Sequence, residues 1–374
     1  MMTRNNQNLG SVLVTGGNGF MATHLIKTLI ARNVCSSITA LDLNPPLDPI
    51  ANVTYVQGSV TSSSIIQDTL RTCGPDVIFH TASPNVTTNR DHPQIFYDVN
   101  VTGTRLLLEA ADRANVKAFV FTSTCDVYLG DTHKDLKEDA PICTKESSPT
   151  GHEYPVSKAL AEELVLSSCE ATEMKCVILR PTHLYGDGDT HAIPVALDVC
   201  APYWPLVQLG AGKNVFDILS TENCAAVHIL AAQCLLNPSL AKGPVSKQIF
   251  NISDGPAINF WDFFIVIYSE SRGHDIRPEL WVMPDWLVWF LVSAIEWAWW
   301  VATAGTKRPQ GKEWMERSIM VFVTGDHEYD GSKAERVLGY RPQGNWKDVL
   351  RKAVRWEIER REGEARVMWG RKTL

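Results

Sequence analysis

The sequence lacks several features that would place it in a particular class of proteins. Its first ten residues, MMTRNNQNLG, contain no apolar run, so we expect no secretory signal peptide. It has no internal repeat and no low-complexity tract. The net charge is −7, so no basic excess exists and nucleic acid is not an expected partner.

Cysteine is present but is not arranged for a disulfide framework or a metal site. The nine cysteines are an odd number, and none forms a C-x-x-C pair. We therefore expect reduced thiols and no bound metal. Charged residues make up only 21% of the chain and hydrophobic residues 45%, which excludes a disordered protein and predicts a globular one with a substantial core.

The first half of the chain alternates short β-branched runs with helical patterns. This alternation predicts an α/β fold with a Rossmann-type, doubly wound parallel sheet. Beyond Pro181 glycine and proline become frequent, so we expect a cofactor-binding domain at 1–181 and a smaller, mainly substrate-binding part at 182–374. The predicted strands are Ser11–Thr15, Ile38–Asp42, Val53–Gln57, Asp76–His80, Ala118–Ser123, Lys175–Arg180 and, later, Gln248–Ile252; the clearest helices are Phe20–Arg32, Gln94–Ala114 and Pro155–Glu170.

A glycine-rich turn, TGGNGFMA at 15–22, joins the first predicted strand to the first predicted helix. Such a turn lets the backbone approach a pyrophosphate, whose charge then lies at a helix N-terminus. A glycine pattern alone is weak evidence, but its place between strand and helix favours dinucleotide binding over a plain tight turn. Ala22 replaces a third glycine and adds only a methyl group. The predicted cofactor contacts here are Gly16, Gly17, Asn18, Gly19, Phe20 and Met21.

Asp42 ends the second predicted strand and indicates which cofactor is bound. A carboxylate at this position accepts hydrogen bonds from the adenine-ribose hydroxyls and repels a 2′-phosphate. No arginine or lysine follows in Asn44–Ile50. Both observations predict NAD rather than NADP.

Tyr154 and Lys158 are four residues apart in YPVSK, so both lie on one face of a predicted helix. A free tyrosine has a pKa of about 10. A nearby ammonium and the positive nicotinamide ring would lower that pKa, which makes Tyr154 the predicted base and Lys158 its partner. Thr124, just past the fifth strand, offers a hydroxyl to the reacting oxygen. Tyr-x-x-x-Lys is common by chance, but the upstream glycine turn and the hydroxyl cluster make chance a poor explanation.

With these residues in place, the chain resembles the extended short-chain dehydrogenase/reductases. Within them it is similar to the 3β-hydroxysteroid dehydrogenase family, and most of all to the sterol-4α-carboxylate 3-dehydrogenases (decarboxylating). The resemblance covers nearly the whole chain. Its landmarks are TGGNGF at 15–20, HTASP at 80–84, VNVTGT at 99–104, FTST at 121–124, YPVSK at 154–158, LRPTHLYGDGD at 179–189, FNISDGPAINFWDF at 250–263 and LGYRPQ at 338–343.

The resemblance implies roles for individual residues. Tyr154 would be the proton acceptor, and Thr124 replaces the usual serine while keeping its hydroxyl. Ser59 stands where the family usually has an aspartate near the adenine. The stretch FDILSTENCAAV at 216–227 keeps Asn223 but lacks the aromatic and acidic residues usual before it, so the substrate is less firmly implied than the chemistry. The resemblance places Ser59, Val60, Ala82, Ser83, Asn100, Lys158 and Pro181 at the cofactor or in support of the site.

Six of the twelve tryptophans lie between Trp281 and Trp300. A helix over Trp286–Ala304, capped by Asp285 and carrying one charge at Glu296, would be about 29 Å long, close to a bilayer core of ~30 Å. It has no polar face, so it is either buried as a lid over a substrate pocket or in contact with lipid. The charge favours a shallow or protein-facing placement over a full span. Four of the tryptophans fall on one side of it: Trp286, Trp289, Trp297 and Trp300.

The sequence therefore predicts an NAD-dependent oxidoreductase that oxidises a 3β-hydroxyl on a sterol or triterpenoid. A 4-carboxysterol, with decarboxylation at C4, is the substrate that the resemblance implies, together with membrane association at the endoplasmic reticulum and a catalytic part facing the cytoplasm. A 3β-hydroxysteroid dehydrogenase/isomerase and a specialised terpenoid dehydrogenase are the alternatives. A non-catalytic dinucleotide sensor and a sugar-nucleotide epimerase fit less well, and a homodimer is compatible with the sequence.

Overall fold

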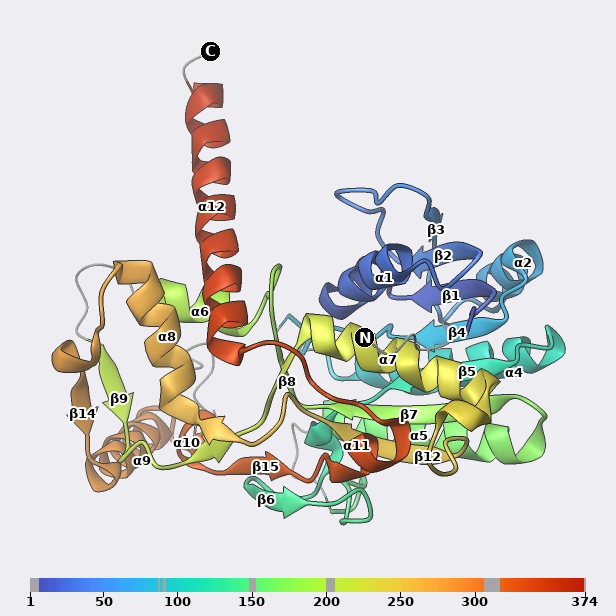
Figure 1. The fold of residues 1–374 in the computed structure, drawn as a ribbon. Helices are drawn as coiled ribbons and strands as arrows, with labels where there is room; N and C mark the ends of the chain where they lie inside the picture. Colours follow the sequence, from blue (N-terminus) through green and yellow to red (C-terminus); the bar gives the residue numbers. More distant parts are fainter. Residues whose placement is uncertain are drawn as a thin grey trace.

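The computed structural model describes residues 7–86, 88–89, 92–147, 153–199, 206–305 and 317–372. A seven-stranded parallel sheet, in the order β12-β7-β5-β4-β1-β2-β3, forms the centre of the larger part (Figure 1). The predicted α/β doubly wound fold is confirmed. The strands are β1 (Ser11–Thr15), β2 (Ser37–Asp42), β3 (Thr54–Gln57), β4 (Val77–His80), β5 (Ala118–Thr122), β7 (Lys175–Pro181) and β12 (Gln248–Ile252).

Strand β1 shows why helices cover both faces of the sheet. Val12 and Val14 pack into one fully buried cluster, while Leu13 between them packs into another. Successive strand residues point to opposite faces, so a strand buried on both sides reads as continuously apolar. The first cluster is covered by α1 (Phe20–Arg32) and α7 (Thr221–Leu236), and the second by α2 (Ser63–Cys73), α4 (Thr104–Arg113) and α5 (Glu153–Ala171).

The helix predicted over Gln94–Ala114 is present, but it is not a uniform α-helix. It consists of α3 (Gln94–Phe96), a π-helical turn η1 (Tyr97–Gly103) and α4. Within the turn, the buried Asn100 donates from Nδ2 to Ser157 Oγ on α5 at 2.9 Å. A π-turn of this kind is uncommon and is frequently found at functional sites.

The residues after Pro181 form smaller elements beside the central sheet, but not all of them leave it. Helix α7 packs on α1, and β12 pairs with β7 from Gln248↔Val177 to Ile252↔Pro181. The division at residue 181 stays a prediction, and the cofactor-binding sheet draws on both sides of it.

The smaller part has a four-stranded sheet, β13-β10-β15-β6, and two strand pairs, β11-β8 and β14-β9. Helix α12 projects from this part toward the C-terminus in Figure 1. The strands are β6 (His133–Leu136), β8 (His183–Tyr185), β9 (Val207–Leu209), β10 (Val215–Phe216), β11 (Ile218–Ser220), β13 (Ile258–Asn259), β14 (Trp281–Met283) and β15 (His327–Tyr329); the helices are α6 (Ala192–Val199), α8 (Phe260–Arg272), α9 (Asp285–Ala302), α10 (Arg317–Thr324), α11 (Ser332–Leu338) and α12 (Trp346–Lys372).

The tryptophan-rich helix α9 packs on the protein along one narrow stripe. Val288 and Val292 are buried against Met320 of α10, and Trp289 is half-buried beside them. Trp289 is therefore less exposed than the three tryptophans predicted to share its side of the helix. The predicted N-cap was wrong, because Asp285 is the first helical residue and Pro284 occupies the cap position. The residues on the outward side are Trp286 (69% exposed), Phe290 (62%), Trp297 (67%) and Trp300 (60%).

None of the helices in the described part of the chain combines the length and apolar character that a membrane crossing requires.

Candidate active site

The predicted site residues gather at one edge of the central sheet. The glycine turn follows β1, Asp42 ends β2, Ser83 follows β4, Thr124 follows β5 and Pro181 ends β7. All these strands are parallel, so their carboxyl ends meet at the same edge. The chain reverses its winding between β1 and β4, and in such sheets ligands bind at this switch point.

The glycine turn is shaped for a dinucleotide by its close contacts. Gly16 has a φ of 68°, and a Cβ there would lie 2.7 Å from Ala82 Cα. A Cβ on Gly17 would lie 2.6 Å from Ala40 Cβ. Both positions therefore require glycine. Gly19 is the N-cap of α1 and provides no side-chain cap, and the first turn contains no acidic residue, so its backbone amides suit a pyrophosphate.

Asp42 lies beside this turn, as the sequence predicts. Its Oδ2 accepts a hydrogen bond from Asn18 N at 3.0 Å, and its Oδ1 accepts one from Asn44 N at 3.0 Å. The carboxylate is thereby fixed at the end of β2, within reach of the turn. The predicted contacts Phe20 and Met21 open helix α1, where Met21 is buried and Phe20 lies edge-on to His24.

The predicted cofactor contacts Ser59 and Val60 are adjacent in the loop that follows β3, the strand next to β2. Ser59 Oγ lies 2.7 Å from Thr61 Oγ1, and Val60 is buried. A Cβ on Gly103 would lie 2.9 Å from a methyl of Val60, so this loop packs directly on the end of η1. The loop and the π-turn are consequently held in contact.

The side chains of Thr124 and Ser83 lie near the hydroxyl group of Tyr154. Hydrogen bonding to these two groups acts to lower the pKa of Tyr154. Thr124 Oγ1 also accepts from Asp126 N at 3.1 Å, which leaves its proton free for the tyrosine. Phe96 packs edge-on against the Tyr154 ring, with 5.8 Å between centroids.

Burial nevertheless raises the pKa of Tyr154, and the charge of Asp126 raises it further. This differs from the expectation that Lys158 lowers it. In the described state, Lys158 Nζ donates to Thr122 O at 2.6 Å and lies 4.5 Å from the centroid of the Phe121 ring. Its charge is thus directed at the end of β5 rather than at the phenol, and burial lowers the pKa of Lys158 to about 7.

Asn100 connects the π-turn to this group of residues. Its Nδ2 donates to Ser157 Oγ at 2.9 Å, and Ser157 Oγ donates to Tyr154 O at 2.8 Å. The Oδ1 of Asn100 is buried and has no hydrogen-bond partner among the described residues. Its position next to α5 agrees with the supporting role that the sequence implies.

Two further residues of this region were not predicted. Asp126 lies two residues past Thr124 and is exposed, and its charge adds to the effect of burial in raising the pKa of Tyr154. Burial lowers the pKa of His183, and the charge of Asp126 is among the causes that oppose this. His183 follows β7 and lies between Phe216 and Phe263, with centroid distances of 5.9 and 6.1 Å. His183 stands inside the motif at 179–189 and Asp126 lies two residues past the motif at 121–124, but their proximity depends on β5 and β7 being neighbours.

Replacing Asp126 by asparagine is expected to move the acid limb of the kcat–pH profile to lower pH. A base must be ionised, so activity rises with pH through the pKa of Tyr154, and the Asp126 charge holds that pKa up. The measurement is kcat against pH for both proteins. An unchanged or more alkaline limb in Asp126→Asn would contradict this role.

The described residues contain no group of three or more histidine, cysteine or acidic side chains placed to hold a metal ion. The eight cysteines among these residues are all free thiols. Neither observation bears on the residues outside this part of the chain, among them Cys200.

Comparison with known proteins agrees with this geometry. The model of the 3-beta hydroxysteroid dehydrogenase/isomerase family matches residues 13–284. The chain belongs to this family. It is 33% identical over 357 residues to the sterol-4-alpha-carboxylate 3-dehydrogenase, decarboxylating, of Schizosaccharomyces pombe, covering 93% of this chain and 97% of the relative. The Saccharomyces cerevisiae enzyme of the same name is 26% identical, with 94% and 99% covered.

Solved structures of other enzymes have a similar fold. A dTDP-glucose 4,6-dehydratase from Streptomyces venezuelae, solved with NAD, has a TM-score of 0.68 at 24% identity and covers 94% of this chain and 98% of its own. A UDP-glucose 4-epimerase from Thermotoga maritima has a TM-score of 0.69 at 19% identity, with 93% and 98% covered. At such identities the likeness concerns the fold alone.

Proposed function

We propose that this protein is an NAD-dependent sterol-4α-carboxylate 3-dehydrogenase that oxidises a 3β-hydroxyl, with loss of the C4 carboxylate as CO2. The observation that carries the proposal is the meeting of Tyr154, Thr124 and Ser83 at one hydroxyl, with Lys158 one helical turn away. The names of the relatives supply the substrate class. A triterpenoid acid is the second candidate, because the stretch at 216–227 departs from the family pattern.

In this proposal Tyr154 accepts the proton of the 3-hydroxyl, while Thr124 and Ser83 hold the reacting oxygen in place. NAD, which the glycine turn and Asp42 would hold, would supply the hydride acceptor and a positively charged ring. That ring and Lys158 favour the tyrosinate, offsetting the burial that raises the pKa of Tyr154. The ketone formed next to a C4 carboxylate makes a β-keto acid, whose carbonyl accepts the electrons released as CO2 leaves.

The test is incubation with NAD and three substrate groups: 4-carboxysterols, plain 3β-hydroxysteroids and triterpenoid acids. Mass spectrometry then shows whether two hydrogens are lost alone or together with CO2. Loss of both from the 4-carboxysterols supports the proposal. Turnover of plain hydroxysteroids with no activity on any 4-carboxylate would overturn it in favour of a dehydrogenase/isomerase.

The cofactor is expected to be NAD rather than NADP. The Asp42 carboxylate ends β2 beside the glycine turn and would repel a 2′-phosphate. Asp42→Ala should therefore narrow the difference in kcat/KM between the two cofactors. Asp42→Asn is the matched variant, because it removes the charge but keeps an oxygen for Asn18 N. A wild-type preference for NADP would refute the assignment.

We extend the proposal to the location of the enzyme: the outward face of α9 attaches it to a membrane surface, at the endoplasmic reticulum where the cell has one, with the active site toward the cytoplasm. The support is the row of large apolar side chains that α9 leaves exposed around Trp286, Phe290 and Trp297. Exposed apolar patches of this kind mark binding surfaces, and tryptophan favours the lipid–water boundary.

A further inference from the structure

A buried ion pair lies one helical turn beyond Lys158. Arg180 donates from Nε to Glu162 Oε1 at 2.9 Å and from Nη2 to Glu162 Oε2 at 2.6 Å. The side chains are 1% and 2% exposed. A two-point guanidinium–carboxylate pair fixes direction as well as distance. The ion pair joins helix α5 to the C-terminal end of strand β7.

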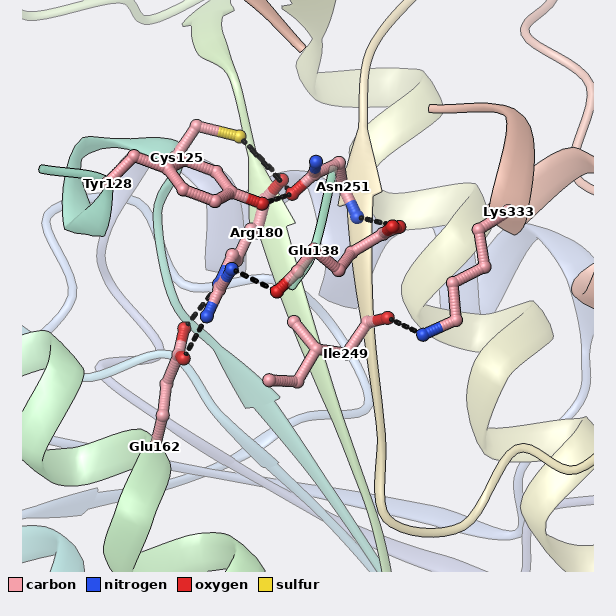
Figure 2. A network of polar contacts seen from close by, with 8 residues as sticks. All are labelled: Cys125, Tyr128, Glu138, Glu162, Arg180, Ile249, Asn251 and Lys333. Carbon is pink, nitrogen blue, oxygen red and sulfur yellow. Dashed lines mark hydrogen bonds and ion pairs between the residues drawn. The ribbon is translucent and has the colours of Figure 1, made fainter. Parts of the chain in front are cut away.

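The same arginine also fixes the turn that carries Thr124 (Figure 2). Its guanidinium carbon lies 4.8 Å from the centroid of the Tyr128 ring, and its backbone O accepts from Cys125 Sγ at 3.3 Å. Cys125 is the first residue of the short 3-10 helix η2 (Cys125–Val127), Tyr128 follows its last residue, and Thr124 is its N-cap. Arg180 thus contacts the chain at the start and just past the end of the turn that follows Thr124.

Further contacts hold the network from the far side. Tyr128 OH donates to Asn251 Oδ1 at 2.7 Å, and Asn251 N donates to Glu138 Oε1 at 3.1 Å. Arg180 Nη1 reaches Glu138 O at 3.3 Å. Figure 2 shows these side chains converging on Arg180 from β12, η2 and the loop after β6. Arg180 is therefore held by contacts with Glu162, Glu138 and Tyr128.

Glu162 also faces the predicted site along its own helix. Tyr154, Lys158 and Glu162 follow at intervals of four, so they share one face of α5. Burial lowers the pKa of Lys158 to about 7, and the charge of Glu162 raises it. The other titratable neighbours of Lys158 carry no compensating charge: burial lowers the pKa of His80 on β4 to about 3 and that of His228, bonded to Thr122, to about 4.

We propose that Glu162 and Arg180 are positioning residues of the dehydrogenase site: their ion pair holds α5, with Tyr154 and Lys158, in register with the Thr124 turn. The proposal rests on the proposed function. Glu162 acts through Lys158, and Arg180 acts through Glu162 and the turn. Neither needs to touch substrate or cofactor.

The decisive variant is the double substitution Glu162→Gln with Arg180→Met. Removing one partner would leave a buried charge uncompensated, whereas replacing both commonly preserves folding. The measurement is NAD affinity by calorimetry from ~pH 5 to ~pH 9, together with kcat. In the wild type, affinity should fall as pH rises through about 7, where Lys158 loses its proton. In the double variant the pH midpoint of this fall in NAD affinity should lie about one pH unit lower. The kcat of the double variant should be about tenfold or more below that of the wild type, measured at a pH where Lys158 is charged in both proteins.

Two variants complete the design. Glu162→Asp keeps the carboxylate and should restore the wild-type midpoint. Glu357→Gln with Arg360→Met removes another ion pair, on α12, in which only the carboxylate is buried, and should leave the midpoint of NAD affinity and kcat unchanged. A folded double variant with the wild-type midpoint and kcat would overturn the proposal. The NAD titration needs no sterol, so a wrong substrate assignment would appear only as a wild type inactive on carboxysterols.

Discussion

Tyr154→Phe is expected to lower kcat by about 10²–10⁴-fold, the usual loss when a general base is removed. The substitution deletes one oxygen and keeps the ring that packs edge-on against Phe96. NAD binding should persist, because the predicted cofactor contacts in the glycine turn and at Asp42 lie after β1 and at the end of β2, and not on α5, which carries Tyr154. The measurements are single-turnover rates with a 4-carboxysterol and NAD affinity by calorimetry.

Tyr340→Phe is the matched control for this change. Tyr340 is buried, and its hydroxyl donates to Ser253 O at 3.1 Å in another part of the molecule. Loss of that bond should cost about 1 kcal/mol of stability and leave kcat near the wild-type value. Activity of Tyr154→Phe within a few-fold of wild type, in a protein that still binds NAD, would remove Tyr154 from the mechanism.

The elements predicted from local signals match the structure closely. β1, α1 and β12 begin and end at the predicted residues. Each is marked by its own sequence: an apolar run ending in a glycine turn, a helix bounded by that turn, and a short β-branched strand. The central sheet follows from these elements because strands that alternate with helices have few other arrangements.

The smaller sheet had no such signal. Its strands have only two to four residues, and β6 joins β15 by pairing His133 with His327, which lie far apart in the sequence. A strand this short is too brief to show the alternation of apolar and polar residues by which strands are predicted. The π-helical turn η1 was not predicted for a related reason. Asn100 within it hydrogen-bonds to Ser157 on another helix, and this contact is not visible in the local sequence. Local propensity predicts a continuous helix there, and tertiary contacts decide otherwise.

The candidate site shows the same limit at the level of single groups. Motifs identified Tyr154, Lys158 and Thr124 by type and spacing, and the fold brings Tyr154 and Thr124 together. The pKa of Tyr154 could not be predicted in this way, because it depends on burial and on Asp126. Arg180 and Glu162 were also missed, since only the pairing of β7 beside α5 makes them neighbours.

The outward face of α9 is expected to decide whether the enzyme sediments with membranes. Val288 and Val292 already pack on the protein, so the exposed tryptophans are not needed for that contact. Burying a large apolar side chain contributes roughly 1.5–3 kcal/mol. Four such side chains, even partly inserted, would shift the partition of the protein by more than about 100-fold. The variant that tests this changes Trp286, Phe290, Trp297 and Trp300 to serine and leaves the half-buried Trp289 in place.

The fractionation is done on cells that express the full chain, without detergent. The wild type should be found in the high-speed pellet and the four-serine variant in the supernatant, with unchanged NAD affinity because α9 lies apart from the central sheet (Figure 1). Val195→Ser with Val199→Ser is the control: it removes exposed apolar side chains from α6 and should leave the protein in the pellet. Glu296, half-buried on the same helix, opposes deep insertion, so salt-resistant but detergent-sensitive pelleting is the expected behaviour. A wild type that stays in the supernatant would show that α9 is not a membrane contact, and its exposed tryptophans would then need a protein partner or the substrate itself to cover them.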